Sequence, residues 1–217
     1  MSFGRTLVVQ PAGTDHLLRV RSRLSSSRQG LVYYSDGYME GPHFPPVCQF
    51  LMHDPVTGTP FFPMDADEVG SGVYPTNSRG GEVGERDSIP MAKLATCESY
   101  AHAIEFMVEK DNTERLSILR HHWWWVANNP RWRNPALSLA PAARANMEAI
   151  LDETTDVTDY ARLLRAELYR ELGDFGKALR ELVSPFSHYA VDFATDQFLM
   201  ATTKDGMLSS YRRNPYP

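Results

Sequence analysis

Residues 166–179 have the sequence AELYRELGDFGKAL. Gly173 lies between two stretches of helical periodicity, and glycine commonly ends a helix. The small side chains of Ala166 and Ala178 permit close approach of two helices, and Phe175 is placed to fill the gap between them. The segment therefore predicts a helical hairpin.

The same segment resembles the middle of a tetratricopeptide repeat (TPR). Five of its residues stand at the spacing of that motif: Ala166, Tyr169, Gly173, Phe175 and Ala178. The match covers about one repeat, and no second copy occurs at a period of about 34 residues. Solenoids of such repeats need roughly three or more copies to bury a continuous core. We therefore expect a single helical hairpin, which packs or binds protein and performs no chemistry.

Helical periodicity continues on both sides of the hairpin, from residue 91 onward. The pattern predicts helices over residues 92–110, 113–128, 141–153, 158–172 and 174–183, with a last helix within 191–204. Pro130 is expected to end the second helix, whereas Pro141 lies near the start of the third, where its missing N–H costs nothing. Residues 91–217 are therefore predicted to form a helical domain of five to six helices.

Two of these predicted helices carry an apolar stripe, which marks the buried face of a helix. The first stripe consists of Leu94, Cys97, Ala101, Ile104 and Val108, and the second of Leu116, Leu119, Trp123 and Val126. Trp123, Trp124 and Trp125 project about 100° apart around a helix, so they cannot all enter one core. Trp123 is expected to be buried. Trp124 either clamps the helical domain to the N-terminal module or forms a hot spot on a binding face.

The N-terminal part of the chain has a different composition. Glycine and proline crowd residues 35–90 and exclude long helices, because proline lacks a backbone donor and disfavours helix in the residue before it. Short strands are predicted at 31–34, 49–52 and 60–62, a turn at 54–59 and a mobile loop at 70–88. The expected fold class is therefore α+β, with a small irregular β module over residues 1–90 before the helical domain.

The overall composition narrows the class of protein. The chain of 217 residues is 42% hydrophobic and 23% charged, which is ordinary for a globular protein and excludes collagen-like, coiled-coil and wholly disordered chains. It has no run of about 18 apolar residues and no signal-peptide pattern, so we expect no membrane span and a cytoplasmic location. Its net charge of −5 disfavours nucleic-acid binding, which needs a basic surface.

That net charge is unevenly distributed along the chain. Residues 1–34 carry +4, residues 35–110 carry −8 and residues 111–217 carry −1. An acidic surface can imitate a nucleic-acid backbone and attract a basic protein. We therefore expect a non-catalytic protein-binding protein, in its sharpest form an immunity-type inhibitor that neutralises a bacterial toxin such as a nuclease. The expected partner-binding residues are Asp65, Asp67, Glu68, Glu82, Glu85, Asp87 and Trp124.

A second class of function is a zinc-binding regulator or an enzyme, which would use Cys48, His53, His121 and His122. With Cys97 and His102, the first two have the composition of a Cys₂His₂ zinc site. Cys97 and His102 are five residues apart, about 140° around a helix, so they cannot chelate one ion. The sequence contains no phosphate-binding glycine loop and no nucleophile motif. We therefore expect no catalysis, no cofactor and no metal.

A looser resemblance extends over most of the chain. It rests on SDG at 35–37, PPVC at 45–48, FF at 61–62, WW at 123–124 and LGDF at 172–175. In these residues the chain is similar to a group of uncharacterised bacterial proteins with a zinc-ribbon-like N-terminal module and a helical, single-TPR-like C-terminal part. Those proteins have Cys-x-x-Cys where this chain has Cys48-Gln49-Phe50-Leu51, so the second sulfur is absent. The resemblance implies the two-part architecture and no particular activity, and an adaptor or chaperone for a secreted effector stays open as an alternative.

Overall fold

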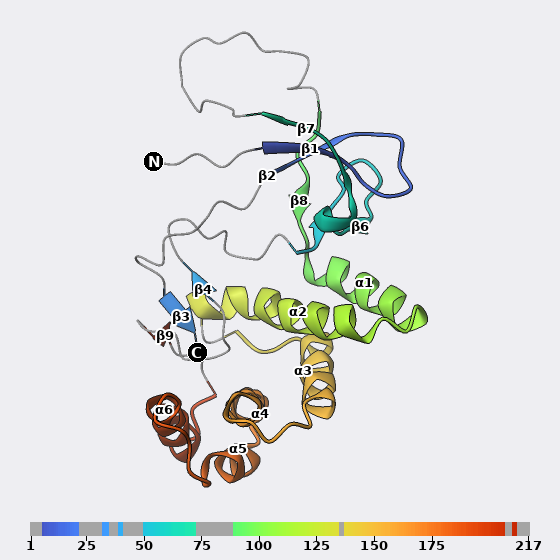
Figure 1. The fold of residues 1–217 in the computed structure, drawn as a ribbon. Helices are drawn as coiled ribbons and strands as arrows, with labels where there is room; N and C mark the ends of the chain where they lie inside the picture. Colours follow the sequence, from blue (N-terminus) through green and yellow to red (C-terminus); the bar gives the residue numbers. More distant parts are fainter. Residues whose placement is uncertain are drawn as a thin grey trace, which may run out of the picture.

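The computed structural model of the protein describes residues 6–21, 32–34, 39–40, 50–72, 89–134, 137–206 and 210–211. In these residues small antiparallel sheets precede six helices, which confirms the predicted α+β fold class. Figure 1 shows the helices α3 to α6 on the opposite side of α2 from the sheet that contains β1. Among the described residues, no helix combines the length and the apolar character needed to cross a membrane.

Each of the three sheets has three strands, and the middle strand of each pairs antiparallel with both neighbours. The first sheet has the order β2-β1-β7, with bounds Leu18–Arg21, Thr6–Gln10 and Asp67–Gly72. The second has the order β4-β3-β9, with bounds Met39–Glu40, Val32–Tyr34 and Ser210–Tyr211. The third has the order β6-β5-β8, with bounds Pro60–Phe61, Met52–His53 and Lys93–Leu94. The second sheet therefore joins a segment near the chain's end to its N-terminal part.

The hairpin between β5 and β6 confirms the predicted turn at 54–59 and the returning strand. Met52 pairs with Phe61, and the Asp54 N–H donates to the Thr59 carbonyl at 2.9 Å. Gly58 has a φ of +77°, a left-handed conformation that favours glycine. A short 3₁₀ helix, η1 (Pro63–Asp65), follows β6. The loop predicted at 70–88 is wrong at its start, because the backbone of 70–72 belongs to β7 and pairs with β1; residues 73–88 lie outside the described residues.

The six helices are α1 (Cys97–Glu109), α2 (Thr113–Arg133), α3 (Pro141–Glu153), α4 (Asp159–Leu172), α5 (Phe175–Leu182) and α6 (Val191–Thr202). Local signals account for most of these bounds. Thr158 and Asp174 accept N-cap hydrogen bonds from backbone N–H groups of α4 and α5, and Pro141 occupies the first turn of α3. The helices are therefore close to their predicted positions.

The predicted end of α2 at Pro130 is wrong, because the helix continues to Arg133. A proline removes one helical hydrogen bond, and the last turn of α2 has tertiary contacts that offset the loss. Asn128 Nδ2 donates to Glu171 Oε1 at 3.3 Å, and Arg131 Nη1 donates to Glu171 Oε2 at 2.6 Å. The Asn134 N–H then donates to the Pro130 carbonyl at 3.0 Å, which closes the helix after the proline.

The buried face of α1 differs from the predicted stripe. Its buried residues are Ser99, Tyr100, Ala103, Ile104 and Met107, whereas Leu94, Cys97 and Val108 are exposed. The predicted stripe began at Leu94, which lies in β8 and not in the helix. Because the prediction treated this strand residue as part of the helix, the predicted stripe is displaced from the observed buried face by about one residue, or 100° around the helix. Cys97 is consequently on the surface rather than in the core.

The stripe predicted on α2 is confirmed, and it forms one of two packing faces of this helix. Leu119 and Trp123 are buried in a cluster with Leu51 and Tyr100, so this face joins α1 and the segment before β5. Trp124, one residue later, is 1% exposed and packs with Met147, Ile150, Leu164 and Leu168 of α3 and α4. Among the described residues, Trp124 therefore packs on other helices and not on the β module, and a side chain that is 1% exposed offers a partner no binding surface.

The hairpin of α4 and α5 has the helix end and the alanine packing predicted for it, whereas Phe175, predicted to fill the gap between the two helices, is only half-buried. Gly173 ends α4 with a φ of +85°, and the Asp174 N–H donates to the Tyr169 carbonyl at 2.8 Å. Ala166 and Ala178 are both fully buried between helices. Ala194 of α6 joins the cluster that contains Ala166, so α6 packs on the hairpin as a third helix.

Candidate functional site

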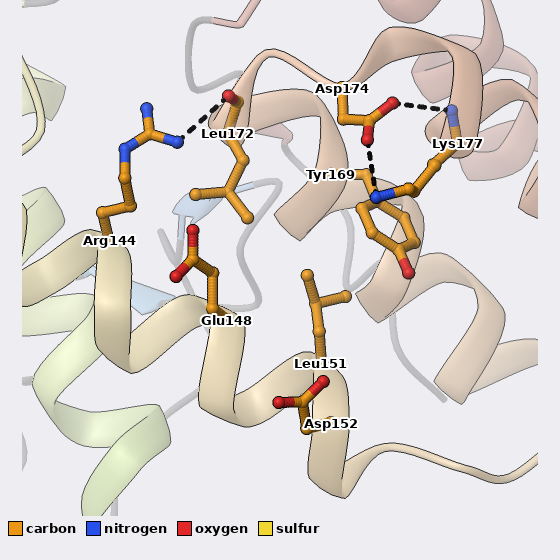
Figure 2. A pocket seen from close by; sticks show the side chains of 8 residues that line it. All are labelled: Arg144, Glu148, Leu151, Asp152, Tyr169, Leu172, Asp174 and Lys177. Carbon is orange, nitrogen blue, oxygen red and sulfur yellow. Dashed lines mark hydrogen bonds and ion pairs between the residues drawn. The ribbon is translucent and has the colours of Figure 1, made fainter.

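A hollow of about 390 Å³ lies between α3 and the α4–α5 hairpin (Figure 2). Its lining residues are Arg144, Glu148, Leu151, Asp152, Tyr169, Leu172, Asp174 and Lys177. Five of these eight side chains are charged, and two are leucines. The hollow therefore combines a polar rim with apolar surface, as binding sites for side chains commonly do.

One wall of the hollow is a single face of α3. Glu148, Leu151 and Asp152 follow one another at three-and-four spacing, which places their side chains on the same side of the helix. Arg144 lies one turn earlier, and its Nη1 donates to the Leu172 carbonyl at 3.4 Å. This contact joins α3 to the end of α4, and the two helices pack through the cluster that contains Met147, Ile150, Leu164 and Leu168.

The opposite wall is formed by the end of α4 and the start of α5. The Lys177 ammonium lies 2.8 Å from Asp174 Oδ2 and 5.3 Å from the centroid of the Tyr169 ring, and Asp174 also accepts the Lys177 N–H at 3.2 Å (Figure 2). The hydrogen bond between the two side chains lowers the pKa of Asp174 and raises the pKa of Lys177. Both groups are therefore charged at neutral pH, and they form an ion pair with each other.

The two carboxylates on α3 are in a different situation. Glu148 and Asp152 are exposed, and neither has an ion pair or hydrogen bond within the part of the chain that the structure describes. Like charges four residues apart on a helix repel each other slightly, so both gain from a cation placed between them. Leu151 and Leu172 lie beside them. A lysine or arginine side chain fits this chemistry, with its methylenes on the leucines and its charge on the carboxylates.

The acidic residues predicted to bind a partner do not gather at this hollow. Asp65 belongs to η1, where both of its carboxylate oxygens accept from the Arg115 guanidinium, and the hydrogen bond to Arg115 lowers the pKa of Asp65. The charge of Asp65, which was predicted to bind a partner, is therefore already paired within the chain. Asp67 and Glu68 are exposed at the start of β7. Glu82, Glu85 and Asp87 lie outside the described residues.

The residues of the zinc or enzyme alternative are also dispersed. Cys48 lies outside the described residues. His53 Nδ1 is 3.5 Å from Ser99 Oγ, and His121 Nδ1 donates to the Ser117 carbonyl at 2.8 Å. His122 is buried against the rings of Phe50 and Trp125. Within the described ranges, no group of three or more His, Cys, Asp or Glu side chains is arranged to hold a metal ion.

A buried His–Asp contact was not predicted from the sequence. His16 Nε2 lies 2.7 Å from Oδ2 of Asp54, whose side chain is 1% exposed. Asp54 also accepts from the Val56 N–H and the Thr57 hydroxyl, each at 2.8 Å. Both carboxylate oxygens are therefore engaged in holding the turn between β5 and β6, which makes this a structural contact.

The hollow was also missed in the sequence, although part of its signal was visible. Glu148 and Asp152 stand four residues apart in a segment whose helix was predicted correctly. The side of α3 that faces the hairpin depends on contacts with Leu164 and Leu168, which are more than ten residues away in the sequence. That pairing is a tertiary property.

Comparisons with known proteins leave the chain without an assigned relative: no protein-family model, no curated protein and no solved structure matches it. The resemblance to bacterial proteins with a zinc-ribbon-like module accordingly stays a prediction.

Proposed function

We propose that the chain is a non-catalytic protein-binding protein, and that the hollow between α3 and the α4–α5 hairpin receives a basic segment of a protein partner. The observation that supports this best is the pair of exposed carboxylates on α3, Glu148 and Asp152, without ion-pair partners among the described residues and beside Leu151 and Leu172. Exposed acids attract a basic protein over some distance and raise its association rate. The leucines add apolar contact for the stems of lysine or arginine side chains.

In its specific form, the proposal is an immunity-type inhibitor in the cytoplasm that neutralises a toxin, such as a nuclease, by covering its basic substrate site. A nuclease binds a polyanionic substrate, so basic side chains line the surface that holds the phosphates. Asp67 and Glu68 on β7 remain exposed and extend the set of acids that support this proposal. Asp65 and Trp124 no longer contribute, because one is paired with Arg115 and the other is buried.

The test is affinity capture with matched variants of the immobilised full chain. Glu148→Gln/Asp152→Asn removes both charges of the hollow and nearly preserves side-chain size. The control is Glu105→Gln/Glu109→Gln on α1, an exposed pair with the same spacing and no ion pair among the described residues. We expect wild type and control to retain a basic protein from a lysate of the native host, and the hollow variant to retain it at least about tenfold more weakly, in line with the loss of charged contacts.

Two outcomes separate the forms of the proposal. Capture by all three proteins to the same extent contradicts a role for the hollow. If a partner is captured through the hollow, its activity is then titrated with the purified chain. Loss of that activity at equimolar chain supports an inhibitor, whereas full activity in the complex points to an adaptor or chaperone.

A further inference from the structure

The outer face of α6 is apolar although it is exposed. Val191, Phe198 and Leu199 are 44%, 43% and 62% exposed. The neighbouring face, with Ala194 and Ala201, is buried, and Ala194 packs in the cluster of the α4–α5 hairpin. Beside its buried face, the helix therefore has apolar side chains that the described part of the chain leaves about half exposed.

Two threonines on this outer face lack free hydroxyls. Thr195 Oγ1 donates to the Val191 carbonyl and Thr202 Oγ1 donates to the Phe198 carbonyl, each at 2.8 Å. Because these hydroxyls are satisfied within the helix, the face offers methyl groups at the threonine positions. Val191, Thr195, Phe198, Leu199 and Thr202 form a continuous stripe along the 12 residues of α6, or about 18 Å. We refer to these five residues as the α6 stripe.

An acidic margin runs along one side of the α6 stripe. Asp192 and Asp196 stand four residues apart and are exposed, and neither has an ion pair among the residues described. Their directions lie about 100° beyond Val191 and Thr195 around the helix. A surface that packs on the stripe therefore meets two negative charges without ion-pair partners at this edge, and basic side chains on the matching edge would complement them.

We propose that the α6 stripe docks an amphipathic helix of a protein partner, one whose apolar face is flanked by lysine or arginine. Helices pack on one another by interdigitating apolar side chains at three-and-four spacing, which is the spacing of the stripe. In stacked helical repeats, a terminal helix normally has a polar outer face, and an apolar outer face is the mark of a helix that another one covers. The acidic margin specifies the charge that the incoming helix carries along the edge that meets Asp192 and Asp196. This surface is distinct from the hollow between α3 and the hairpin, and the inference does not depend on the function proposed for that hollow.

The probe is a designed 18-residue helical peptide with a leucine face and lysines along one edge of it, labelled for fluorescence anisotropy. Two further peptides have glutamates in place of the lysines, or the same composition in scrambled order. The full chain is compared with Leu199→Ser, Phe198→Ser/Leu199→Ser and Asp192→Asn/Asp196→Asn. Matched controls are Val157→Ser and Met64→Ser, which remove apolar side chains that are both 85% exposed elsewhere on the surface. Circular dichroism establishes that each variant is folded.

We expect the lysine peptide to bind wild type and both controls equally. Its affinity should fall about tenfold with the stripe variants and about threefold to tenfold with the aspartate variant, and added salt should weaken it. The glutamate and scrambled peptides should bind at least about tenfold more weakly than the lysine peptide. The stripe variants should lower peptide affinity by the same factor in a Glu148→Gln/Asp152→Asn background, which removes any lysine peptide held at the hollow, so failure of the hollow and failure of the stripe are separable.

Equal binding of the lysine and glutamate peptides, or unchanged binding by the stripe variants, overturns the proposal. Sedimentation provides the other decisive measurement. Self-association of wild type that Leu199→Ser abolishes assigns the stripe to a second copy of the chain and contradicts a partner helix. Binding that appears only when residues 212–217, which follow β9, are removed assigns the stripe to the chain's own end, and it also contradicts the proposal.

Discussion

Arg115 Nη2 lies 2.7 Å from Asp65 Oδ1, and Nη1 of the same guanidinium contacts Oδ2, so α2 and η1 are joined by a two-pronged ion pair. The guanidinium carbon also lies 4.9 Å from the centroid of the Phe62 ring. These contacts connect residues 50 positions apart and attach the segment after β6 to the helical part of the molecule. Asp65 thus serves an internal junction, although its sequence context suggested a docking surface.

Asp65→Asn should therefore lower stability, whereas Asp67→Asn should not. Both side chains of the ion pair are more than a third exposed, so solvent screens the pair and the expected loss is about 0.5–1 kcal/mol in the free energy of unfolding. Asp67 is exposed and has no ion pair among the described residues. Urea denaturation of the two variants measures the difference. Equal midpoints for both would show that the junction contributes nothing.

Protonation of Asp54 should lower the free energy of unfolding at acidic pH. Burial raises the pKa of Asp54, but the hydrogen bonds from Val56, Thr57 and His16 outweigh it and hold the pKa below 3.8. Because the folded-state pKa is below the unfolded one, the contribution of Asp54 is present above about pH 4 and is lost as pH falls through the folded value. Asp54→Asn should cost about 1–3 kcal/mol at pH 7 and flatten the profile below pH 4.

Urea midpoints of wild type and Asp54→Asn at intervals between pH 7 and pH 2.5 measure this effect. Asp15→Asn is the control, because Asp15 lies beside His16 in the sequence but is fully exposed. A profile for Asp54→Asn that parallels wild type down to the lowest pH would contradict the assignment.

Replacement of Trp124 should change the stability of the protein and not its binding of a partner. Trp124→Ala should cost about 3–5 kcal/mol, because it leaves a large cavity among Met147, Ile150, Leu164 and Leu168. Trp124→Phe should cost much less, since the indole N–H that it removes has no hydrogen-bond partner among the described residues. Partner capture by the folded Trp124→Phe protein should equal that of wild type. Reduced capture at unchanged stability would restore Trp124 as an anchor.

The elements that were predicted well depend on residues close to them in the sequence. The features that were missed depend on contacts between residues far apart in the sequence. Gly173, Thr158 and Pro141 act on residues within one helical turn, so the bounds of α3 and α4 were visible in the sequence. The partner of Asp65 is 50 residues away, and no local pattern points to Arg115. The burial of Trp124 also has a distant cause. The sequence pattern of a helix that packs on two sides cannot be told from that of a helix with one buried face and one exposed face.

The two glycines of the hairpin should respond to alanine in opposite directions. Gly173 has a φ of +85°, and no atom lies within 4 Å of the position that an alanine methyl group would take. Gly173→Ala is therefore resisted by backbone strain alone and should cost about 1 kcal/mol. Gly176 lies in the first turn of α5 with no positive φ, and a methyl group there meets only Asp174 Oδ1 at 4.0 Å. Gly176→Ala should stabilise by about 0.5–1 kcal/mol through helix propensity. Thermal denaturation of both variants checks the signs, and a shift in the same direction for both would contradict this account.

The buried pair of Glu167 and Arg170 on α4 should show the largest difference between single and double replacement. Both side chains are 0% exposed, Arg170 Nη2 lies 2.5 Å from Glu167 Oε1, and Arg170 Nη1 donates to the Asp205 carbonyl at 2.7 Å. Arg170→Met leaves the Glu167 carboxylate buried without its counter-charge and should cost about 3–5 kcal/mol.

Glu167→Leu/Arg170→Met removes both charges together and should recover most of that loss, because a buried ion pair is offset by the cost of desolvating its members. The recovery should remain incomplete, since methionine at position 170 cannot donate a hydrogen bond to the Asp205 carbonyl. The segment after α6 therefore loses that contact with α4. Urea denaturation gives the two free energies, and hydrogen exchange at the C-terminal turn of α6 reports the lost tie. A double variant as unstable as Arg170→Met would show that packing, and not the unpaired carboxylate, dominates at this position.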